Sequence, residues 1–280
     1  MTVLGVNGST RLLGVVGDPI AQVRAPGVWT ALFQRNRVNC VCLPCHVAPA
    51  QLATFFAGVR SLRNLAGLIV TIPHKPAIVG LLDDVSERAR QVGAANVVRF
   101  DQDGRSFGDI LDGEGLVSGL RGAGQQINGR RALVVGSGGV GSAIAFALAH
   151  AGVTEVALSD IAEGRAASLA QRLNGAGYSG RVHGPDPASF DLIVNASPLG
   201  MRADDPLPFD CARLDSHAIV ADVVIHDGLT PLLHAAQKRG CYVQPGTVMS
   251  DHQVPEMADF FDFGSGDWTP QAIAEITTRN

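Results

Sequence analysis

Short apolar runs alternate with helical patterns through the first third of the chain. Closely spaced apolar residues predict buried strands over Leu12–Val16, Asn39–Val47, Leu68–Ile72 and Ala95–Arg99. Apolar residues that share one face predict helices over Pro26–Arg35, Pro49–Arg60 and Asp84–Val92. Because strands alternate with helices, we expect a mainly parallel sheet.

From about Gly113 the alternation becomes more regular. A strand over Ala132–Val135 runs directly into a Gly-Ser-Gly-Gly-Val-Gly motif at 136–141, and an alanine-rich helix follows over Ser142–Ala151. Further strands are predicted over Val156–Ser159, Leu192–Ala196, Ile219–Val223 and Tyr242–Gln244. This order of strand, glycine turn, helix and further strands predicts a Rossmann unit. The tail from Met249 to Asn280 has a helical pattern and is expected to pack back onto the first unit.

The glycine motif points to a dinucleotide. In such motifs the first glycine, here Gly136, permits a tight turn, the second, Gly138, lets the backbone approach a pyrophosphate, and the third, Gly141, lets helix and strand pack closely. The phosphates would bind to backbone N–H groups at the start of the helix, including those of Gly139 and Val140. The alternative is a glycine turn in an unrelated α/β protein.

An acidic residue follows at the expected distance. Asp160 ends the next predicted strand, 19 residues beyond Gly141. A carboxylate there would accept hydrogen bonds from the ribose hydroxyls and repel a 2′-phosphate, which favours NAD over NADP. The alternative is a surface aspartate that lies only beside the cofactor.

Composition and charge exclude several classes of protein. Of 280 residues, 46% are hydrophobic and 17% charged, with a net charge of −4 and no block of basic residues, so we expect no nucleic-acid partner. No apolar run approaches the ~18–20 residues that a membrane helix needs, and the N-terminus shows no secretion signal. We therefore expect a cytoplasmic protein that does not enter a membrane.

Three cysteines lie close together at Cys40, Cys42 and Cys45, followed by His46. They fall in a predicted strand, where adjacent side chains point to opposite faces and cysteine serves as a small apolar residue. We expect no metal site.

Lysine is rare in this chain. Only Lys75 and Lys238 are lysines among 22 basic residues. Lysine, unlike arginine, can give up its proton near neutral pH, so a lysine beside a buried strand is a candidate for proton transfer. The alternative for Lys75 is a solvated surface cation.

A series of motifs carries a specific resemblance. The motifs are Gly17-Asp18-Pro19-Ile20 with Pro26, Val70 to Lys75, Gly93 to Asn96, Gly108 to Gly113, Asn195 to Met201, Thr230 to Leu233, and Gln253 after Gly246 and Met249. In this order, and over nearly the whole chain, they resemble the successive motifs of the shikimate/quinate dehydrogenase family.

The resemblance implies roles for particular residues. It implies that Lys75 and Asp112 form the catalytic pair, and that Thr71, Asn96 and Gln253 bind substrate hydroxyls. Asn96 could instead cap a turn, Thr71 could simply favour a strand, and Gln253 could lie on a solvated helix face. On the cofactor side the resemblance adds Ala196, Ser197, Met201 and Gly246.

The chain departs from the family where a substrate carboxylate is expected to bind. Two serines of the family are replaced by Val23 and Ala25, with Arg24 between them, and a tyrosine is replaced by Ile225. A buried carboxylate without donors costs several kcal/mol. Either Arg24 supplies the counter-charge, or the substrate differs from shikimate.

These observations predict two α/β domains with a cleft between them. Residues 1–112, with the tail 247–280 packed back on them, would bind the substrate and carry out catalysis, and residues 113–246 would form the Rossmann domain. The expected activity is reversible hydride transfer between NAD, or NADP, and a ring hydroxyl of a polyol acid. A family member with a different hydroxylated substrate and a non-catalytic nucleotide-binding sensor are the alternatives. A monomer and a homodimer are both compatible with the sequence.

Overall fold

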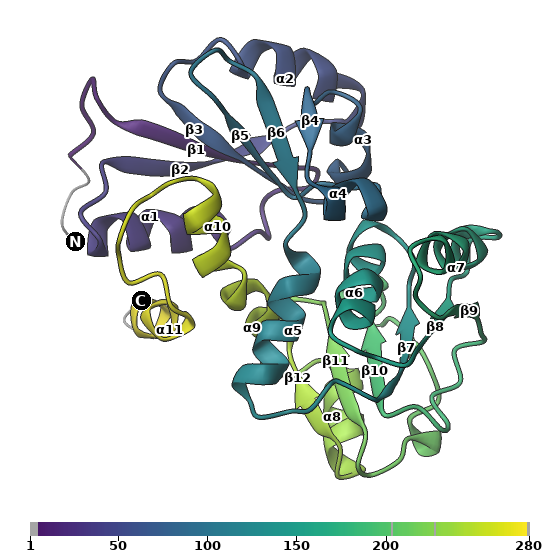
Figure 1. Ribbon diagram of the computed structural model, residues 1–280. Coiled ribbons are helices and arrows are strands. Elements are labelled where there is room, and N and C mark those ends of the chain that lie inside the picture. The colour runs from purple at the N-terminus through teal and green to yellow at the C-terminus, as the bar shows by residue number, and fades with distance from the viewer. Residues whose placement is uncertain (1–4, 203, 227, 279–280) are drawn as a thin grey trace. The chain divides into compact units, whose positions relative to one another are not determined.

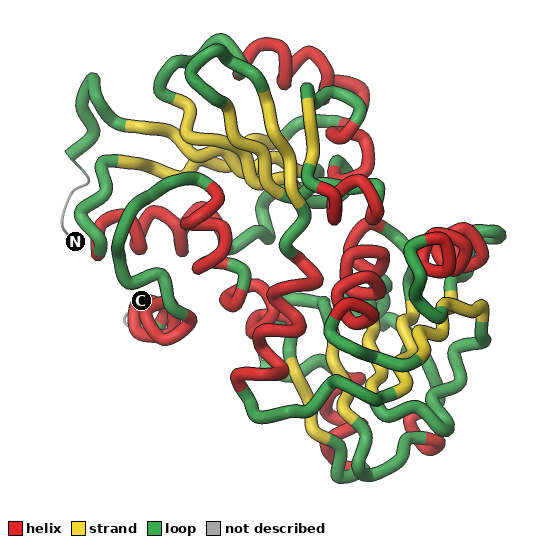
Figure 2. Tube along the Cα trace, in the orientation of Figure 1, coloured by secondary structure: helices red, strands yellow, loops and turns green. Residues whose placement is uncertain are grey.

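The computed structural model describes residues 5–202, 204–226 and 228–278. It divides into two compact units. Unit 1 comprises Met1–Leu111 and Val254–Asn280, and unit 2 comprises Asp112–Gln253. Asp112, expected at the end of the first domain, and residues 247–253, expected with the tail, both group with unit 2. In each unit the strands form a layer with helices on both sides, as Figure 2 shows in yellow and red. The predicted α/β class is confirmed.

Unit 1 contains a six-stranded mixed sheet in the order β2-β1-β3-β5-β6-β4 (Figure 1). Its strands are β1 (Arg11–Gly17), β2 (Cys40–His46), β3 (Leu65–Val70), β4 (Asp84–Val85), β5 (Val97–Phe100) and β6 (Ser106–Asp109). Its helices are α1 (Ala25–Arg35), η1 (Pro49–Gln51), α2 (Leu52–Val59), α3 (Lys75–Val79), α4 (Glu87–Val92), α10 (Val254–Phe260) and α11 (Pro270–Thr277).

The sheet of unit 1 is mainly parallel, as predicted, because β1 is parallel to β2 and β3, and β4 is parallel to β6. Only β5 runs antiparallel to its neighbours, β3 and β6. The helix predicted from Asp84 begins only at Glu87, since Asp84 and Val85 pair with β6 as a short strand. Ser86 then caps the helix by accepting a hydrogen bond from the backbone N–H of Ala89 at 3.1 Å.

The central strands of unit 1 are buried on both faces. Leu13 and Val15 of β1 join a cluster with α1, α10 and α11, whereas Val16 joins a second cluster with α2 and α3. This alternation follows from the two-residue period of a strand. It explains why the strands read as continuous apolar runs in the sequence.

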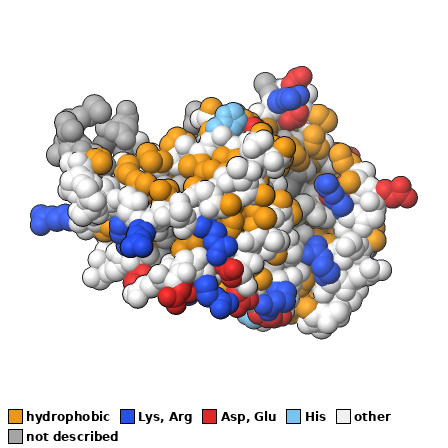
Figure 3. Space-filling view, turned by 90° about the horizontal axis from the view of Figure 1, so that it is seen from above, with side chains coloured by type: hydrophobic (Ala, Val, Ile, Leu, Met, Phe, Trp, Pro, Cys, Tyr) orange, Lys and Arg blue, Asp and Glu red, His pale blue; other side chains and the backbone are white. Residues whose placement is uncertain are grey.

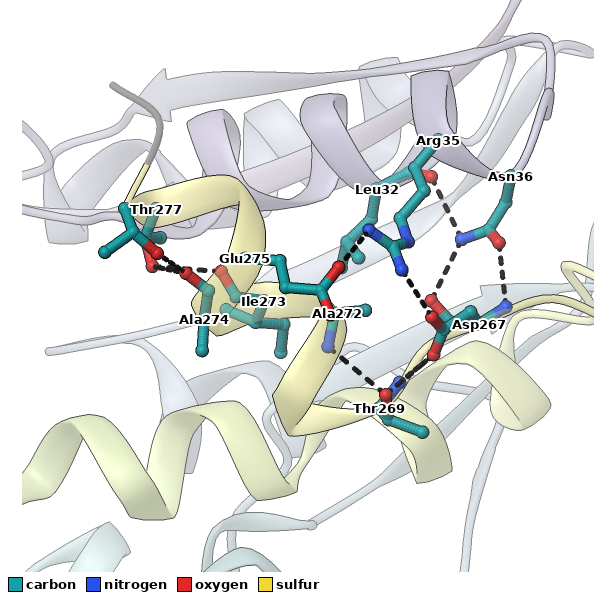
Figure 4. Close-up of polar contacts among 11 residues, drawn as sticks. Leu32, Arg35, Asn36, Asp267, Thr269, Ala272, Ile273, Ala274, Glu275 and Thr277 are labelled. Atoms are coloured by element: carbon teal, nitrogen blue, oxygen red, sulfur yellow. Dashed lines mark hydrogen bonds and ion pairs between the residues drawn. The ribbon is translucent and has the colours of Figure 1, made fainter.

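The C-terminal tail is fixed to α1 by polar contacts (Figure 4). Trp268 of the tail also packs against Trp29 and Phe33 of α1. Arg35 pairs with Asp267 and Glu275, each at 2.8 Å, and Asn36 accepts from the backbone N–H of Asp267 at 2.7 Å. Thr269 caps α11: its hydroxyl donates to Asp267 and accepts from the N–H of Ala272.

Unit 2 contains a six-stranded sheet in which every pair is parallel, in the order β12-β11-β10-β7-β8-β9. Its strands are β7 (Arg131–Val135), β8 (Glu155–Ser159), β9 (Gly180–Val182), β10 (Leu192–Asn195), β11 (Ile219–Asp222) and β12 (Tyr242–Gln244). Its helices are α5 (Asp112–Gly122), α6 (Gly139–His150), α7 (Arg165–Gly175), η2 (Cys211–Arg213), α8 (Pro231–Lys238) and α9 (Gly246–His252). Counted from β7, this is the doubly wound order of a Rossmann fold, with its switch point between β7 and β10.

Glycines allow α5 to pack closely on its neighbours. A Cβ on Gly113 would lie 2.3 Å from the carbonyl oxygen of Ala143 in α6, and a Cβ on Gly115 would lie 2.4 Å from that of Met249 in α9. These positions therefore need glycine although glycine disfavours helices.

The surface carries both signs of charge. On the face seen in Figure 3, Lys and Arg side chains are interspersed with Asp and Glu. Among the described residues no helix is both long and apolar enough to cross a membrane.

Candidate functional site

The glycine loop joins β7 to α6. Gly136 has φ +102°, and a Cβ there would lie 2.6 Å from the backbone carbonyl of Ala196. A Cβ on Gly141 would lie 1.9 Å from the oxygen of Gly136. Gly138 is different: it has an extended backbone with φ −74°, and its Cβ would meet no atom within 4 Å. Gly136 and Gly141 are therefore required by the backbone, whereas Gly138 faces open space.

Asp160 follows β8 and is held by two backbone donors. The N–H of Ser137 donates to its Oδ2 at 2.7 Å, and the N–H of Ala162 donates to its Oδ1 at 2.8 Å. The carboxylate is thereby fixed beside the glycine loop. The hydroxyl oxygen of Ser137 is buried and has no partner among the described residues.

The segment after β10 lies against the same loop. The N–H of Ala196 donates to the carbonyl oxygen of Val135 at 2.7 Å, and the side chain of Ser197 is hydrogen-bonded to Asn195. Met201, further along, is 54% exposed. Gly246 begins α9, and a Cβ there would lie 2.6 Å from the carbonyl oxygen of Val223. These residues thus lie at the carboxyl ends of the strands, where doubly wound folds bind ligands.

In unit 1, Thr71, Lys75 and Asn96 are brought together at one end of the sheet. Thr71 follows β3, and its carbonyl accepts from the N–H of His74 at 2.9 Å. Lys75 is 7% exposed at the start of α3, and its carbonyl accepts from the N–H of Ala95 at 2.9 Å. Asn96 is 2% exposed, and its Oδ1 accepts from the N–H of Leu111 at 2.9 Å. The interpretation of Lys75 as a solvated cation is wrong.

In unit 2, Asp112 and Gln253 are both buried, at 4% and 5% exposure. Asp112 begins α5, and Gln253 follows α9. Gly115 lies one helical turn from Asp112, and a Cβ on it would lie 2.5 Å from Cγ of Gln253. The alternative that Gln253 lies on a solvated helix face is therefore wrong.

Arg24 precedes α1 and is partly exposed, with no described side chain paired to its guanidinium group. Val23 and Ala25, on either side of it, pack against the apolar cluster of unit 1. In unit 2, Ile225 is 47% exposed. The positions that depart from the family pattern thus hold apolar side chains.

Three polar residues of unit 2 received no role from the sequence. Asn195 and Asp222 end adjacent parallel strands and are paired in register, and Thr230 caps α8. All three are buried, and they are joined by hydrogen bonds. The feature of the sequence that could have indicated Asn195 and Asp222 is a single polar residue at the end of an apolar strand.

Within the described residues, no cluster of three or more His, Cys, Asp or Glu side chains could hold a metal ion. Burial raises the pKa of the Cys40 thiol to about 11 and that of Cys42 higher still, which disfavours the thiolate that a metal would bind.

Unit 2 has a parallel sheet in Rossmann order with a glycine loop at its switch point, and unit 1 is a second α/β unit that contains a buried lysine. This architecture defines a two-domain protein of the dinucleotide-binding class. Comparison with known proteins narrows the class. The model of the shikimate dehydrogenase substrate binding domain matches residues 15–98. A shikimate dehydrogenase (NADP(+)) of Rubrobacter xylanophilus is 39% identical over 263 residues, covering 90% of this chain and 91% of that protein. The chain belongs to the shikimate/quinate dehydrogenase family, which confirms the resemblance seen in its motifs.

Solved structures agree with this assignment. The shikimate 5-dehydrogenase from Listeria monocytogenes, in complex with shikimate and NAD, has a TM-score of 0.88 at 27% identity, and the match covers 98% of each chain. The ligand-free 5-ketofructose reductase of Gluconobacter has a TM-score of 0.84 at 25% identity, covering 95% of this chain and 99% of that one.

Proposed function

We propose that this protein is an NAD(P)-dependent dehydrogenase that interconverts a ring hydroxyl and a ketone on a shikimate- or quinate-like polyol acid. The observation that carries the proposal is the buried Lys75, in a chain that belongs to a dehydrogenase family. A pure nucleotide sensor has no need of a proton acceptor, so a lysine buried in unit 1 favours a catalytic role.

Alcohol oxidation removes a hydride from carbon and a proton from oxygen. A bound nicotinamide supplies the hydride acceptor. We assign the proton to Nζ of Lys75, which takes it as the C–H bond breaks and the carbonyl forms, and returns it in the reverse direction. Asp112, which the family pattern pairs with this lysine, would orient its ammonium group. Thr71, Asn96 and Gln253 would donate to or accept from the other substrate hydroxyls. In this scheme the cofactor binds to unit 2.

The glycine loop fits a dinucleotide. Gly138 leaves room for a phosphate, and α6 directs its first N–H groups toward that space. The buried hydroxyl of Ser137 has no protein partner among the described residues, and it can donate to a ligand oxygen.

The proposed preference is for NAD. Asp160 is fixed beside the loop by two N–H groups, so its negative charge would face the adenine ribose. A 2′-phosphate would be repelled there. The family includes enzymes named for NADP, so this preference depends on the residues of this chain.

A second candidate substrate is a neutral polyol or ketose. Val23 and Ala25 direct their methyl groups into apolar packing where the family pattern has serine hydroxyls. The similar 5-ketofructose reductase acts, by its name, on a sugar that carries no carboxylate.

A panel of shikimate, quinate and neutral ketoses, each assayed with both nicotinamide cofactors, tests the proposal. Turnover of a polyol acid supports the first candidate, and turnover of ketoses alone supports the second. Failure of every substrate, together with no binding of NADH, would contradict the proposed activity. The double variant Val23→Ser/Ala25→Ser should raise kcat/KM for shikimate if the lost hydroxyls limit its binding, by roughly a hundred-fold or more for two hydrogen bonds to a charged group. If Arg24 has taken over the carboxylate, the double variant should change little and Arg24→Ala should abolish turnover of shikimate.

A further inference from the structure

A buried carboxylate joins three segments of unit 2. Asp222 ends β11 and is only 1% exposed. Its Oδ1 accepts from Nδ2 of Asn195 at 2.9 Å and from the N–H of Val224 at 3.1 Å. Its Oδ2 accepts from the hydroxyl of Thr230 at 2.7 Å. Burial raises the pKa of this carboxyl, and the hydrogen bonds from Thr230, Val224 and Asn195 oppose the rise.

Asn195 connects Asp222 to the loop that follows β10. Its Nδ2, besides contacting Asp222, donates to the carbonyl oxygen of Leu199 at 2.9 Å. Its Oδ1 accepts from the backbone N–H of Ser197 at 3.1 Å and from the hydroxyl of the same residue at 2.6 Å. An ionised carboxylate only accepts hydrogen bonds, so it fixes which end of the Asn195 amide faces it. The other end is then directed to Ser197.

Thr230 anchors the third segment. Its hydroxyl donates to Asp222 and accepts from the N–H of Leu233 at 3.3 Å, so one side chain caps α8 and holds the carboxylate. Thr230 is 1% exposed. A hydroxyl can do both at once because it has one donor and two acceptor sites, whereas a methyl group of the same size can do neither.

The loop held in this way borders the glycine motif. Ala196 begins it and lies against the backbone of Gly136, where a Cβ would approach within 2.6 Å. In a doubly wound sheet the dinucleotide crosses the switch point. Asp160, after β8, lies on the side that binds the adenine ribose. The loops after β10 and β11 therefore border the opposite, nicotinamide half.

We propose that Asn195, Asp222 and Thr230 are positioning residues that hold the loop 196–201 in the shape that receives the nicotinamide half of the cofactor. This inference rests on the proposed function of unit 2 as a nicotinamide dinucleotide site. The three residues act through the loop and need not touch the cofactor themselves. The carboxylate of Asp222 orients the amide of Asn195, and that amide holds the loop. Loss of any member of the network should therefore disturb the same loop.

Thr230→Val tests the proposal, because it keeps the shape of the side chain and removes the hydroxyl. NADH binding is measured by fluorescence titration and binding of ADP-ribose, which lacks the nicotinamide, by calorimetry. We expect NADH affinity to fall roughly ten-fold, as for one lost hydrogen bond to a charged group, while ADP-ribose affinity stays within about two-fold. Thr230→Ser, which restores the hydroxyl, should recover most of the NADH affinity.

Thr269→Val is the matched control. Thr269 in unit 1 also caps a helix while it donates to an aspartate, so this variant loses the same kind of hydrogen bonds in the other unit. It should lower the Tm and leave both affinities unchanged. NADH affinity in Thr230→Val that stays within two-fold of the unaltered protein would overturn the inference, as would an equal loss for both ligands.

Asp222→Asn provides a second test if Thr230→Val does not fold. Its amide replaces one of the two carboxylate oxygens by an NH2 group, so the hydrogen bonds to that oxygen, either from Asn195 and Val224 or from Thr230, are lost. We expect the same selective loss of NADH affinity. An unaltered protein that binds neither NADH nor ADP-ribose would contradict the proposed function itself. Unaltered protein that binds both, with variants that do the same, would contradict only the positioning role.

Discussion

The glycines at 136 and 138 should respond in opposite ways to the same change. In Gly136→Ala the new methyl would lie 2.6 Å from the backbone of Ala196, at a residue whose φ is +102°. In Gly138→Ala the methyl would enter open space, at φ −74°. The first variant should damage the folded protein, and the second should damage only the binding of a dinucleotide.

The magnitudes follow from the geometry. A positive φ costs a residue with a Cβ ~1–2 kcal/mol, and overpacking against backbone costs ~1–3 kcal/mol more. Gly136→Ala should therefore lose about 2–5 kcal/mol of stability, or roughly 10 °C in Tm for a domain of this size. Gly138→Ala should be neutral, or stabilising by up to ~1 kcal/mol, because the unfolded chain loses freedom. Its methyl would separate N–H groups from phosphate oxygens, and one or two such hydrogen bonds are worth ~10–100-fold or more in affinity.

Thermal unfolding without ligand and titration with NADH measure the two effects separately. Gly124→Ala is the control for Gly136, since Gly124 has φ +74° but no atom near its Cβ position, so it isolates the backbone strain. Gly175→Ala, at the far end of α7 and in open space, is the control for Gly138. NADH binding by Gly138→Ala as tight as that of the unaltered protein would contradict the role of Gly138. Unfolding of Gly136→Ala at the same temperature as Gly124→Ala would contradict the predicted clash at Gly136.

Three further variants test the chemistry and the burial of single residues. Lys75→Ala should lower kcat on the best substrate by ~10²–10⁴-fold, the usual size of a general acid–base effect, while NADH affinity changes little. Retention of more than half of the turnover would remove Lys75 from the mechanism. Asp160→Asn removes a charge that would repel a 2′-phosphate, so the ratio of kcat/KM for NAD to that for NADP should fall by about ten-fold, most strongly at low salt. An unchanged ratio would show that Asp160 does not set the preference. Burial lowers the pKa of His252 below its ordinary value of 6.5, so the unfolded chain takes up the proton first as the pH falls, and stability is lost below about 6.5. His252→Gln should lack this component in the free energy of unfolding measured by urea between roughly pH 5 and 7. A slope identical to that of the unaltered protein would refute this reading.

The strands of the Rossmann unit could be predicted closely because they are buried on both faces. The predicted Ala132–Val135 is observed as Arg131–Val135, and the predicted Val156–Ser159 as Glu155–Ser159. Because helices cover both faces of the sheet, each strand is a continuous apolar run that can be identified from its own sequence. The glycine loop was recognisable for the same reason, as it follows such a run directly.

Elements that depend on tertiary contacts could not be predicted. The helix α5 contains four glycines, and its sequence alone argues against a helix. Those glycines are explained only by the close approach of α6 and α9. The strand β6 is four residues long and has no apolar run, and Gly108 within it fits against Leu82, whose Cδ1 would lie 2.3 Å from an added Cβ.

The residues of the candidate site can be separated in the same way, into those that local sequence identifies and those that depend on tertiary contacts. Residues such as Lys75 and Gly138 stand out by rarity or by spacing along the chain, so the sequence could single them out. Asn195 and Asp222 are 27 residues apart and become partners only because β10 and β11 pair with these two residues in register. A strand register is a property of the assembled sheet, so no local pattern in the sequence could predict that Asn195 and Asp222 are paired.

The polar residues at the strand ends of unit 2 also differ in whether their side chains are hydrogen-bonded within the protein. The side chain of Asn195 makes its contacts inside the protein, to Asp222, Ser197 and Leu199, which suits a residue that sets a shape. Ser137 has the opposite character, because its buried hydroxyl has no partner among the described residues. Leaving such a group unsatisfied costs ~1–3 kcal/mol, and a ligand oxygen that accepts its proton would remove that cost. Ser137→Ala therefore deletes a group whose only proposed partner is the cofactor, whereas Thr230→Val deletes one whose partners are all protein. The first change should cost affinity without stability and the second both, and this difference separates residues that bind from residues that position.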